Sequence, residues 1–388
     1  MEKRSNNTTH FKPDQNLQDL QNSSTHRKYS FTIFKIICIL AIGILIAFIW
    51  NIGNAKNFLL SEINLMSTID KDYANLTQPT TSTDPQEISL LFLGDIMLDR
   101  GIRAQISKLG SDEVFVLSTK KLSDNYDLTI ANLEGPITTH PSKTIGPDGL
   151  GIPGFSFTFP TSSATALKKS GIDIVSLANN HTDNFGQEGL AQTVKWLSQS
   201  NLKHFGNPTN SPKSESPVSA ISQIICEKEI CIALIGYNEF TYQNETNILD
   251  EIKDAQEKNV DFIIIMPHWG VEYENFPSTK QKTLAHAWID AGADLIVGAH
   301  PHVIQSIETY KDKKIYYSIG NYLFDQYFSY DTTHGLALGI HLEKTTAPDS
   351  TVIKSVDLLP IDNTKSITRP AGEVDSKKIL DKLAEISI

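Results

Sequence analysis

Residues that can bind metal ions or move protons follow five separate apolar stretches of this sequence. They are Asp95, Glu134, Asn180 with His181, His268, and His300 with His302. Carboxylate oxygens are hard ligands that can bridge two divalent cations, imidazole nitrogens suit Zn, Mn or Fe, and an asparagine carbonyl supplies a neutral oxygen. This mixed set predicts two divalent metal ions that activate water and clamp the oxygens of a transferred phosphoryl group.

Each of these residues has an expected role. Asp95, Glu134, Asn180, His268, His300 and His302 are the predicted metal ligands, and His181 is the predicted proton donor, with Asp183 holding its ring. The predicted substrate contacts are Asn132, Asn179, Glu272 and Asn321. Three alternatives stay open, because Asp95 could cap a helix, Asn179 could hold a turn, and His300 with His302 could be a structural pair.

The apolar stretches are short enough to be strands, and helical segments separate several of them. "EISLLFLGD", "DLTIANLEGP", "GIDIVSLANNH", "VDFIIIMPHWG", "ADLIVGAHPHVIQ" and "KKIYYSIGNYLFDQ" are the segments that carry the polar residues. We expect the histidines of His300-Pro301-His302 to alternate along an extended segment and face one side. Buried strands alternating with helices predict an α/β sheet whose site lies at the carboxyl ends of the strands.

One long segment between these strands is rich in glycine and proline. It runs from His140 to Pro160. Such a segment is either a flexible loop beside the site or a plain surface excursion, and the sequence favours neither.

The amino-terminal part of the chain predicts a membrane anchor. Residues 1–30 form a polar tail, Phe31 to Trp50 is an apolar run with one charge at Lys35, and residues 51–87 form a stalk before a domain at 88–388. About 20 apolar residues can span a hydrocarbon core roughly 30 Å thick. Arg27, Lys28 and Lys35 place the tail in the cytoplasm and the domain outside the cell. A cleaved signal peptide is the alternative.

Charge and cysteine content narrow the possible partners. The net charge is −11 and the isoelectric point is about 5.5, whereas nucleic-acid binding requires a basic surface, so no nucleic-acid partner is expected. Cys38 lies in the predicted anchor, and Cys226 and Cys231 lie in a predicted hairpin. That pair is either bridged or reduced, and its spacing is not that of a zinc site.

Six motifs carry a resemblance to a known family. In order they are "LFLGDIMLDR", "TIANLEGPIT", "DIVSLANNHTDNFG", "IMPHWGVEY", "LIVGAHPHVIQ" and "YSIGNYLFDQ". They are similar to the bacterial capsule-synthesis CapA family, which is associated with poly-γ-glutamate capsules and resembles calcineurin-like metallophosphoesterases. The resemblance covers about Ile88 to Leu342 and implies a four-layer α/β/β/α sandwich.

The phosphoesterase resemblance supports most of the metal ligands and departs at two positions. It implies metal roles for Asp95, His268 and the final His300-x-His302, and it matches Asn180 and His181 to the Asn-His pair of that family. Met97 stands where a histidine is implied, and Glu134 replaces an aspartate. These departures imply either one metal held tightly and the other weakly, or a different ligand such as Asp99.

Two functions follow from the resemblance. The first is a membrane-anchored, extracytoplasmic metallohydrolase that acts on a phosphate ester or an envelope polymer intermediate. The second is a non-catalytic factor that binds an anionic surface polymer such as poly-γ-glutamate in the same cleft and assists its export. Membrane-bound polymer synthase components are the expected protein partners in either case. His181 favours catalysis, and Met97 favours the second function.

Overall fold

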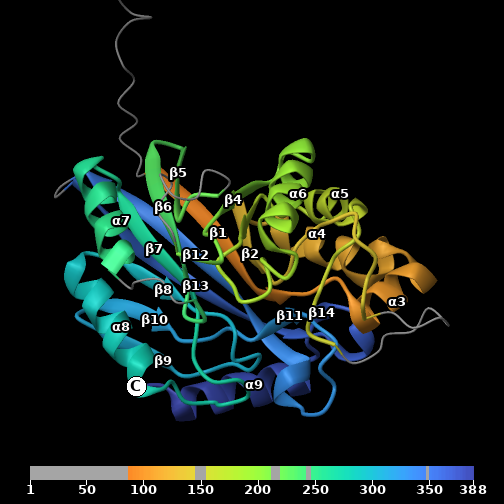
Figure 1. Ribbon diagram of the computed structural model, residues 1–388. Helices are drawn as coiled ribbons and strands as arrows, with labels where there is room; N and C mark the ends of the chain where they lie inside the picture. The colour runs from red at the N-terminus through yellow and green to blue at the C-terminus, as the bar shows by residue number, and fades with distance from the viewer. Residues whose placement is uncertain (1–85, 145–153, 211–218, 242–245, 347–348) are drawn as a thin grey trace, which may run out of the picture. The chain divides into compact units, whose positions relative to one another are not determined.

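The computed structural model describes residues 86–144, 154–210, 219–241, 246–346 and 349–388 (Figure 1). The predicted tail, the anchor at 31–50 and nearly all of the stalk lie outside these residues, so the structure leaves those predictions untested. Among the helices that are described, none combines the length and the apolar character needed to cross a bilayer.

The first sheet is built around the strand that carries Asp95. Its order is β14 (Arg369–Pro370), β13 (Asp349–Asp362), β12 (His334–Thr346), β1 (Gln86–Ile96), β2 (Leu128–Leu133), β3 (Ile174–Ser176) and β4 (Lys203–Phe205), and β11 (Asn321–Leu323) also pairs with β1. The pairs from β1 to β4 are parallel, whereas β12 and β13 run antiparallel. Polar residues at the ends of β1, β2 and β3 therefore share one edge.

The second sheet is also mixed. Its order is β5 (Ser222–Glu227), β6 (Ile230–Asn238), β7 (Phe262–His268), β8 (Leu295–Val297), β10 (Lys313–Tyr316) and β9 (Ile307–Tyr310). β6, β7 and β8 are parallel, so His268 at the end of β7 and the His300 segment after β8 leave the sheet at the same edge.

Three apolar cores define the order of the layers. Successive side chains of β1 face opposite sides of the sheet and so contribute to two of these cores. Leu93 faces a core with the first group of helices, whereas Leu90 and Phe92 face a core between the two sheets. The first helices are α3 (Arg100–Leu109), η1 (Asp112–Val116), α4 (Leu117–Ser123), α5 (Ser162–Lys169) and α6 (Gly186–Gln199). The third core joins the second sheet to α7 (Thr246–Glu257) and α8 (Thr279–Ala291). The expected α/β/β/α order is confirmed (Figure 1).

Two short 3-10 helices and one α-helix accompany the last long strands of the chain. η2 (Asp331–Thr333) precedes β12, η3 (Thr364–Ser366) follows β13, and α9 (Glu373–Ile386) is the last helix. Leu383 of α9 contributes to the core between the sheets.

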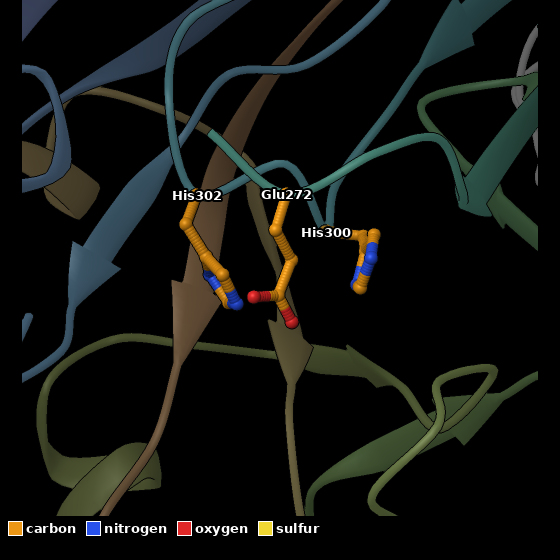
Figure 2. Close-up of side chains that lie close together, drawn as sticks. All are labelled: Glu272, His300 and His302. Carbon is orange, nitrogen blue, oxygen red and sulfur yellow. The ribbon is translucent and has the colours of Figure 1, made fainter. Parts of the chain in front are cut away.

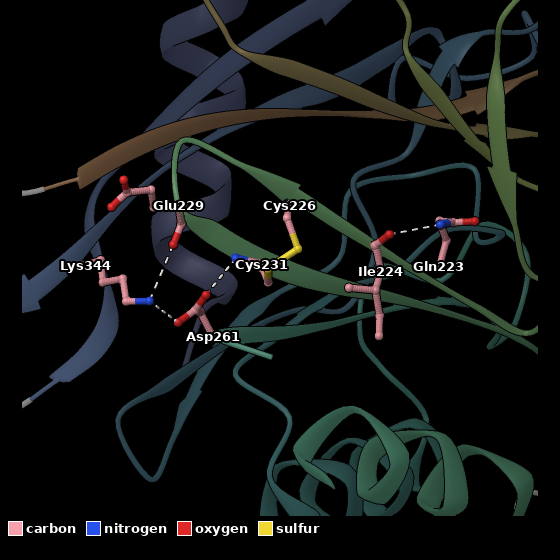
Figure 3. Close-up of a disulfide and its surroundings, with 7 residues drawn as sticks. All are labelled: Gln223, Ile224, Cys226, Glu229, Cys231, Asp261 and Lys344. Atoms are coloured by element: carbon pink, nitrogen blue, oxygen red, sulfur yellow. Dashed lines mark hydrogen bonds and ion pairs between the residues drawn. A yellow bond between two sulfur atoms is a disulfide. The ribbon is translucent and has the colours of Figure 1, made fainter. Parts of the chain in front are cut away.

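The hairpin cysteines are bridged. Cys226 on β5 and Cys231 on β6 are directly opposed in the strand register and form a disulfide (Figure 3). The backbone N–H of Cys231 also donates to Asp261 at 2.7 Å, and Lys344 pairs with the same carboxylate at 2.7 Å. The bridged alternative is therefore the one that the structure adopts.

Candidate metal centre

Two strand ends and one close backbone approach fix the position of Asp95. Its N–H donates to the carbonyl of Gly320 at 3.1 Å, and its register partner on β2 is Asn132. β11 can approach this closely because Gly94 has no side chain, since a Cβ there would lie 1.9 Å from the Gly320 oxygen. The carboxylate of Asp95 is fully buried at the edge where both sheets end.

Two groups of potential ligand atoms converge at this edge, and they share one residue. Asp95, Glu134 and His302 form the first group, and Glu272, His300 and His302 form the second, with the ligand atoms of each group within 4.8 Å of one another. Figure 2 shows the Glu272 carboxylate lying between the imidazoles of His300 and His302. His302 is thus placed to serve both groups.

Glu134 provides a test of whether the residues fit a cation. The side chain is fully buried, and neither carboxylate oxygen has a hydrogen-bond partner among the described residues. Burial, together with the neighbouring carboxylate of Asp95, raises its pKa well above the usual range. A buried carboxylate without donors is costly unless it is protonated or paired with a cation. Carboxylate and imidazole ligands beside it fit a divalent metal ion.

Asn321 fixes the orientation of the His302 ring. The Asn321 amide nitrogen donates to Gln326 at 3.0 Å and to the Thr332 carbonyl at 2.9 Å. Its oxygen is therefore left to accept from His302 Nδ1 at 2.9 Å. This contact directs Nε2 of His302, with its lone pair, toward Glu134 Oε1 at 3.7 Å. Such a partner sets the tautomer that a metal-binding histidine requires.

A chain of polar contacts joins His268 to both sheets. Its Nε2 lies 3.0 Å from Asn180 Oδ1 and 3.1 Å from His300 Nδ1. On the other side its Nδ1 lies 3.2 Å from Asn132 Nδ2. His268 and Asn180 therefore lie beside the centre, although neither belongs to the two convergent groups. Burial lowers the pKa of His268 well below its usual range and that of His300 to about 2, so both rings are neutral.

The backbone at the histidines differs from the sequence expectation. β8 ends at Val297, and His300 and His302 have φ angles of 95° and 59°. The prediction of an extended segment was wrong, because a left-handed turn directs the two rings into the centre. Tyr273, with φ of 67°, and Arg100, with φ of 47°, are also in the left-handed region. Non-glycine residues in this region cost about 1–3 kcal/mol each and cluster at functional sites.

The expected partner of His181 was also wrong. Asp183 is exposed, and no described contact joins its carboxylate to the His181 ring. Asn184 Oδ1 instead lies 3.2 Å from His181 Nδ1 and accepts from the Phe157 N–H at 2.8 Å. Because that oxygen is an acceptor, Nδ1 carries the ring proton and Nε2 faces Glu134 at 3.9 Å. Burial lowers the pKa of His181 to about 4.

A pair of variants separates these two neighbours. Asn184→Ala should reduce the kcat of a metal-dependent hydrolysis at least about tenfold, because His181 loses the contact that sets its tautomer. Asp183→Ala should leave kcat within about twofold, since its side chain does not touch the ring. Steady-state assays of both variants check the assignment, and equal losses would contradict it.

Three residues predicted to contact substrate are buried and already occupied. Asn132 donates to Asp95 at 2.7 Å, and Asn321 holds His302. The side-chain oxygen of Asn179 accepts from the backbone N–H groups of His181 at 3.2 Å and Thr182 at 3.0 Å, so Asn179 holds the turn. The polar atoms of these residues position the centre, and their contact with a substrate stays a prediction. Glu272 is exposed and lies in the second ligand group.

Asp99 does not replace the imidazole missing at Met97. Its carboxylate is buried against Ser142 Oγ at 2.7 Å, the Thr158 N–H at 2.9 Å and Arg103 Nε at 2.9 Å. Met97 is itself fully buried, and its sulfur accepts from the Asp99 N–H at 3.0 Å. Ser142 belongs to the long Gly- and Pro-rich segment, and residues 145–153 of that segment lie outside the described part of the chain.

Arg100 is a cation at the centre that had no predicted role. Its guanidinium pairs with Asp325 and lies 5.0 Å from the ring of Phe157 and 5.4 Å from that of Phe324. Its charge influences the pKa values of both Glu134 and His181, although burial is the dominant cause of each shift. Its Nε has no partner within the described residues. The only sequence signal was its place in the first motif.

Aromatic rings border the histidines. Phe240 lies 4.1 Å from the His300 ring, and Phe157 lies 4.3 Å from the His181 ring. Tyr273 stacks at 6.2 Å from His302. Phe157 shows that the carboxyl-terminal end of the long segment does lie beside the centre. These rings exclude water from one side of each imidazole.

The bacterial capsule synthesis protein PGA_cap family matches residues 89–326 by its sequence model. The chain belongs to this family. The matched region contains all of the candidate ligands and confirms the resemblance that the six motifs indicated.

Two relatives illustrate the membership. The capsule biosynthesis protein CapA of Bacillus anthracis is 30% identical over 64% of this chain and 62% of its own length. The PGA biosynthesis protein CapA of Bacillus subtilis strain 168 is 28% identical over 66% of this chain and 68% of its own length. The match thus spans less than two thirds of the Bacillus anthracis protein.

Solved structures show a weaker likeness. A novel phosphatase from Mycoplasma pneumoniae has a TM-score of 0.45 with 14% identity, covering 77% of this chain and 100% of that one. The calcineurin-like phosphoesterase YfkN from Bacillus subtilis has a TM-score of 0.41 with 14% identity, covering 78% and 99%. The layer order given above rests on the strand pairing and the cores, and not on these likenesses.

Proposed function

We propose that this chain is a membrane-anchored, extracytoplasmic protein of poly-γ-glutamate or related surface-polymer biosynthesis, with a divalent-metal-dependent hydrolase site of the phosphoesterase type. Family membership and the names of the Bacillus relatives support the biosynthetic role. The metal centre supports the hydrolase activity.

One observation carries the hydrolase proposal. Glu134 is buried with two unpartnered oxygens, at the meeting point of two ligand groups that share His302. A hydrophobic core would gain nothing from this arrangement, whereas cations would satisfy it. The proposed ligands are Asp95, Glu134, Glu272, His300 and His302, with His268 and Asn180 beside them. The proposed cofactors are two divalent ions among Mn, Fe and Zn.

The remaining polar groups suit a hydrolysis. Bound divalent cations would supply Lewis-acid activation of water and of the scissile group. His181 presents Nε2 to the centre and is neutral at pH 7, so it can accept a proton and return it to a leaving group. Arg100 places a positive charge beside Glu134 and can hold an anionic group of the substrate.

The proposed localisation rests on two features. The apolar run Phe31 to Trp50, with Lys28 before it and Lys35 near its start, suits a single-pass anchor with an outward domain. The Cys226–Cys231 disulfide suits an oxidising compartment outside the cytoplasm. The proposed partners are an anionic polymer or phosphate ester and membrane-bound components of the polymer synthase.

A non-catalytic role in polymer assembly or export is the second candidate. The observation that favours it is Met97, which is buried where the phosphoesterase resemblance implies a histidine ligand, while Asp99 is engaged elsewhere. A centre with fewer imidazoles can still hold an anion through a metal ion without turning it over.

Activity assays on the purified full-length chain distinguish the candidates. The wild type and His300→Ala are assayed with Mn²⁺ on bis(p-nitrophenyl) phosphate and on poly-γ-glutamate. We expect turnover of at least one substrate by the wild type, its loss in His300→Ala, and its loss when chelator is added. Metal-dependent binding of poly-γ-glutamate without turnover of either substrate would instead establish the assembly role.

A further inference from the structure

A separate groove borders the metal centre. It has a volume of about 1110 Å³ and lies between α3 and two later segments, which run from Tyr327 to Thr333 and from Thr364 to Ser366. None of the proposed metal ligands lines it. The groove is therefore a surface distinct from the metal centre, and a role in binding metal does not account for the side chains that line it.

The charge of the groove is opposite to that of the chain. The sequence has 45 acidic and 34 basic residues, yet the groove is lined by Lys108 and Lys365 and by no carboxylate. Within the described residues neither ammonium has an ion-pair partner. Three acidic residues near the groove are already paired, Asp325 with Arg100, Asp331 with Lys382 and Asp362 with Arg369. A fourth, Asp375, accepts a hydrogen bond from the hydroxyl of Tyr330 at 3.0 Å.

Gln105 brings the two lysines to the same part of the groove. Its amide donates to the carbonyl of Lys365 at 3.2 Å, and Lys108 follows it by one helical turn on α3. Lys365 has a φ of 58°, which is costly for a residue with a side chain. Both lysine side chains are exposed.

Exposed aromatic rings complete the groove. Tyr327 is 49% exposed and Phe328 is 65% exposed, which is unusual for large apolar rings. The Tyr327 hydroxyl is hydrogen-bonded to Ser366, so that ring is fixed against the segment that carries Lys365. Apolar faces beside free cations suit a ligand that carries both methylene groups and negative charges.

The groove begins at the edge of the metal centre. Gly101 lines it, directly follows Arg100, and donates its N–H to Asp325 at 2.8 Å. Phe328 lines it as well and contacts Tyr273 edge-on at 4.9 Å, and Tyr273 stacks on His302. A chain lying in the groove would therefore pass directly to Arg100 and the ligand groups.

We propose that this groove binds a segment of a polycarboxylate chain. Lys108 and Lys365 would pair with its carboxylates, and Tyr327 and Phe328 would pack on its methylene groups. Polyphosphate offers the charges but has no methylene groups for the rings, so the groove favours the carboxylate polymer. The inference deepens the proposed function by adding a polymer-binding subsite beside the metal centre. It rests on that function only for the reaction that the bound chain would then undergo.

Binding of fluorescent γ-linked glutamate oligomers to the purified full-length chain tests the groove. The variants are Lys108→Ala/Lys365→Ala and a matched control, Lys253→Ala/Lys258→Ala, which removes the same charge from two exposed positions, one on α7 and one directly after it. We expect the groove variant to weaken binding about tenfold and the control to change it less than about twofold. Binding by the wild type should also weaken as NaCl is raised.

His300→Ala separates this proposal from the hydrolase proposal. It should keep oligomer binding by the groove even if metal-dependent turnover is lost. Tm values check that each variant is folded. Wild-type affinity in the folded groove variant, equal losses in both double variants, or no oligomer binding by the wild type would each overturn the groove proposal. Absence of turnover with the groove effect intact would overturn only the hydrolase.

Discussion

Glu134→Gln is expected to stabilise the metal-free protein and to abolish most of the stabilisation that divalent cations provide. The wild-type carboxylate is buried beside Asp95 without hydrogen-bond donors, and its pKa is raised. A raised pKa means that folded-state stability falls as pH rises through that pKa, because the buried carboxylate must then ionise. Glutamine removes this cost, so the metal-free variant is expected to be more stable than the metal-free wild type at pH 8.

The same substitution removes an anionic ligand of the first group. Cations at about 1,000 times their Kd stabilise a protein by about 4 kcal/mol, and the variant should lose most of this shift. Thermal unfolding with chelator and with Mn²⁺ measures both effects, with Glu113→Gln on an exposed position as the control. A variant that is less stable than the wild type without metal would contradict the cost of the buried carboxylate. A variant that keeps the full metal-induced shift would show that Glu134 is not a ligand.

His181→Ala is expected to lower kcat by about 100- to 10,000-fold while leaving the metal content unchanged. His181 belongs to neither ligand group, yet its Nε2 faces the Glu134 carboxylate at 3.9 Å. We therefore expect the side chain to act on a proton and not to hold the metal. His286→Ala, on α8, is the control because that ring pairs with Glu308 away from the centre.

Two readouts keep this prediction specific. kcat for a phosphodiester and metal content per chain are measured on the same preparation of each variant. Loss of metal together with activity would make His181 a ligand. Unchanged kcat with intact metal would remove it from catalysis and favour the assembly role.

The sequence predicted which residues meet but not how their polar atoms are used. Asp95 and His268 lie at the ends of parallel strands of the two sheets, and His300 follows a third such strand. Strand ends share an edge whatever the details of the loops. The choice between Asp183 and Asn184 depended on which side chain turns toward the ring, which periodicity does not encode. In the same way, Asn321 was assigned to the substrate because nothing in the sequence shows that its oxygen is taken by His302.

One strand and one cation were missed for related reasons. β12 contains Gly335 and Gly339, which suggest breaks in a strand, but both allow a close approach. A Cβ at Gly335 would lie 2.0 Å from the Asn321 carbonyl, and one at Gly339 would lie 2.4 Å from the Tyr126 hydroxyl. Arg100 follows Asp99 at the start of a helix, where an exposed arginine is the usual outcome. Its left-handed backbone and its pairing with Asp325 are tertiary properties.

The metal content of the purified full-length chain, compared with His302→Ala and His300→Ala, tests the centre most directly. His302 belongs to both ligand groups, whereas His300 belongs to one. After loading with Mn²⁺ and removal of excess metal, the wild type should hold metal, His300→Ala should hold less, and His302→Ala should hold almost none. A wild type without bound metal, or a folded His302→Ala variant with wild-type content, would contradict a metal centre built on His302.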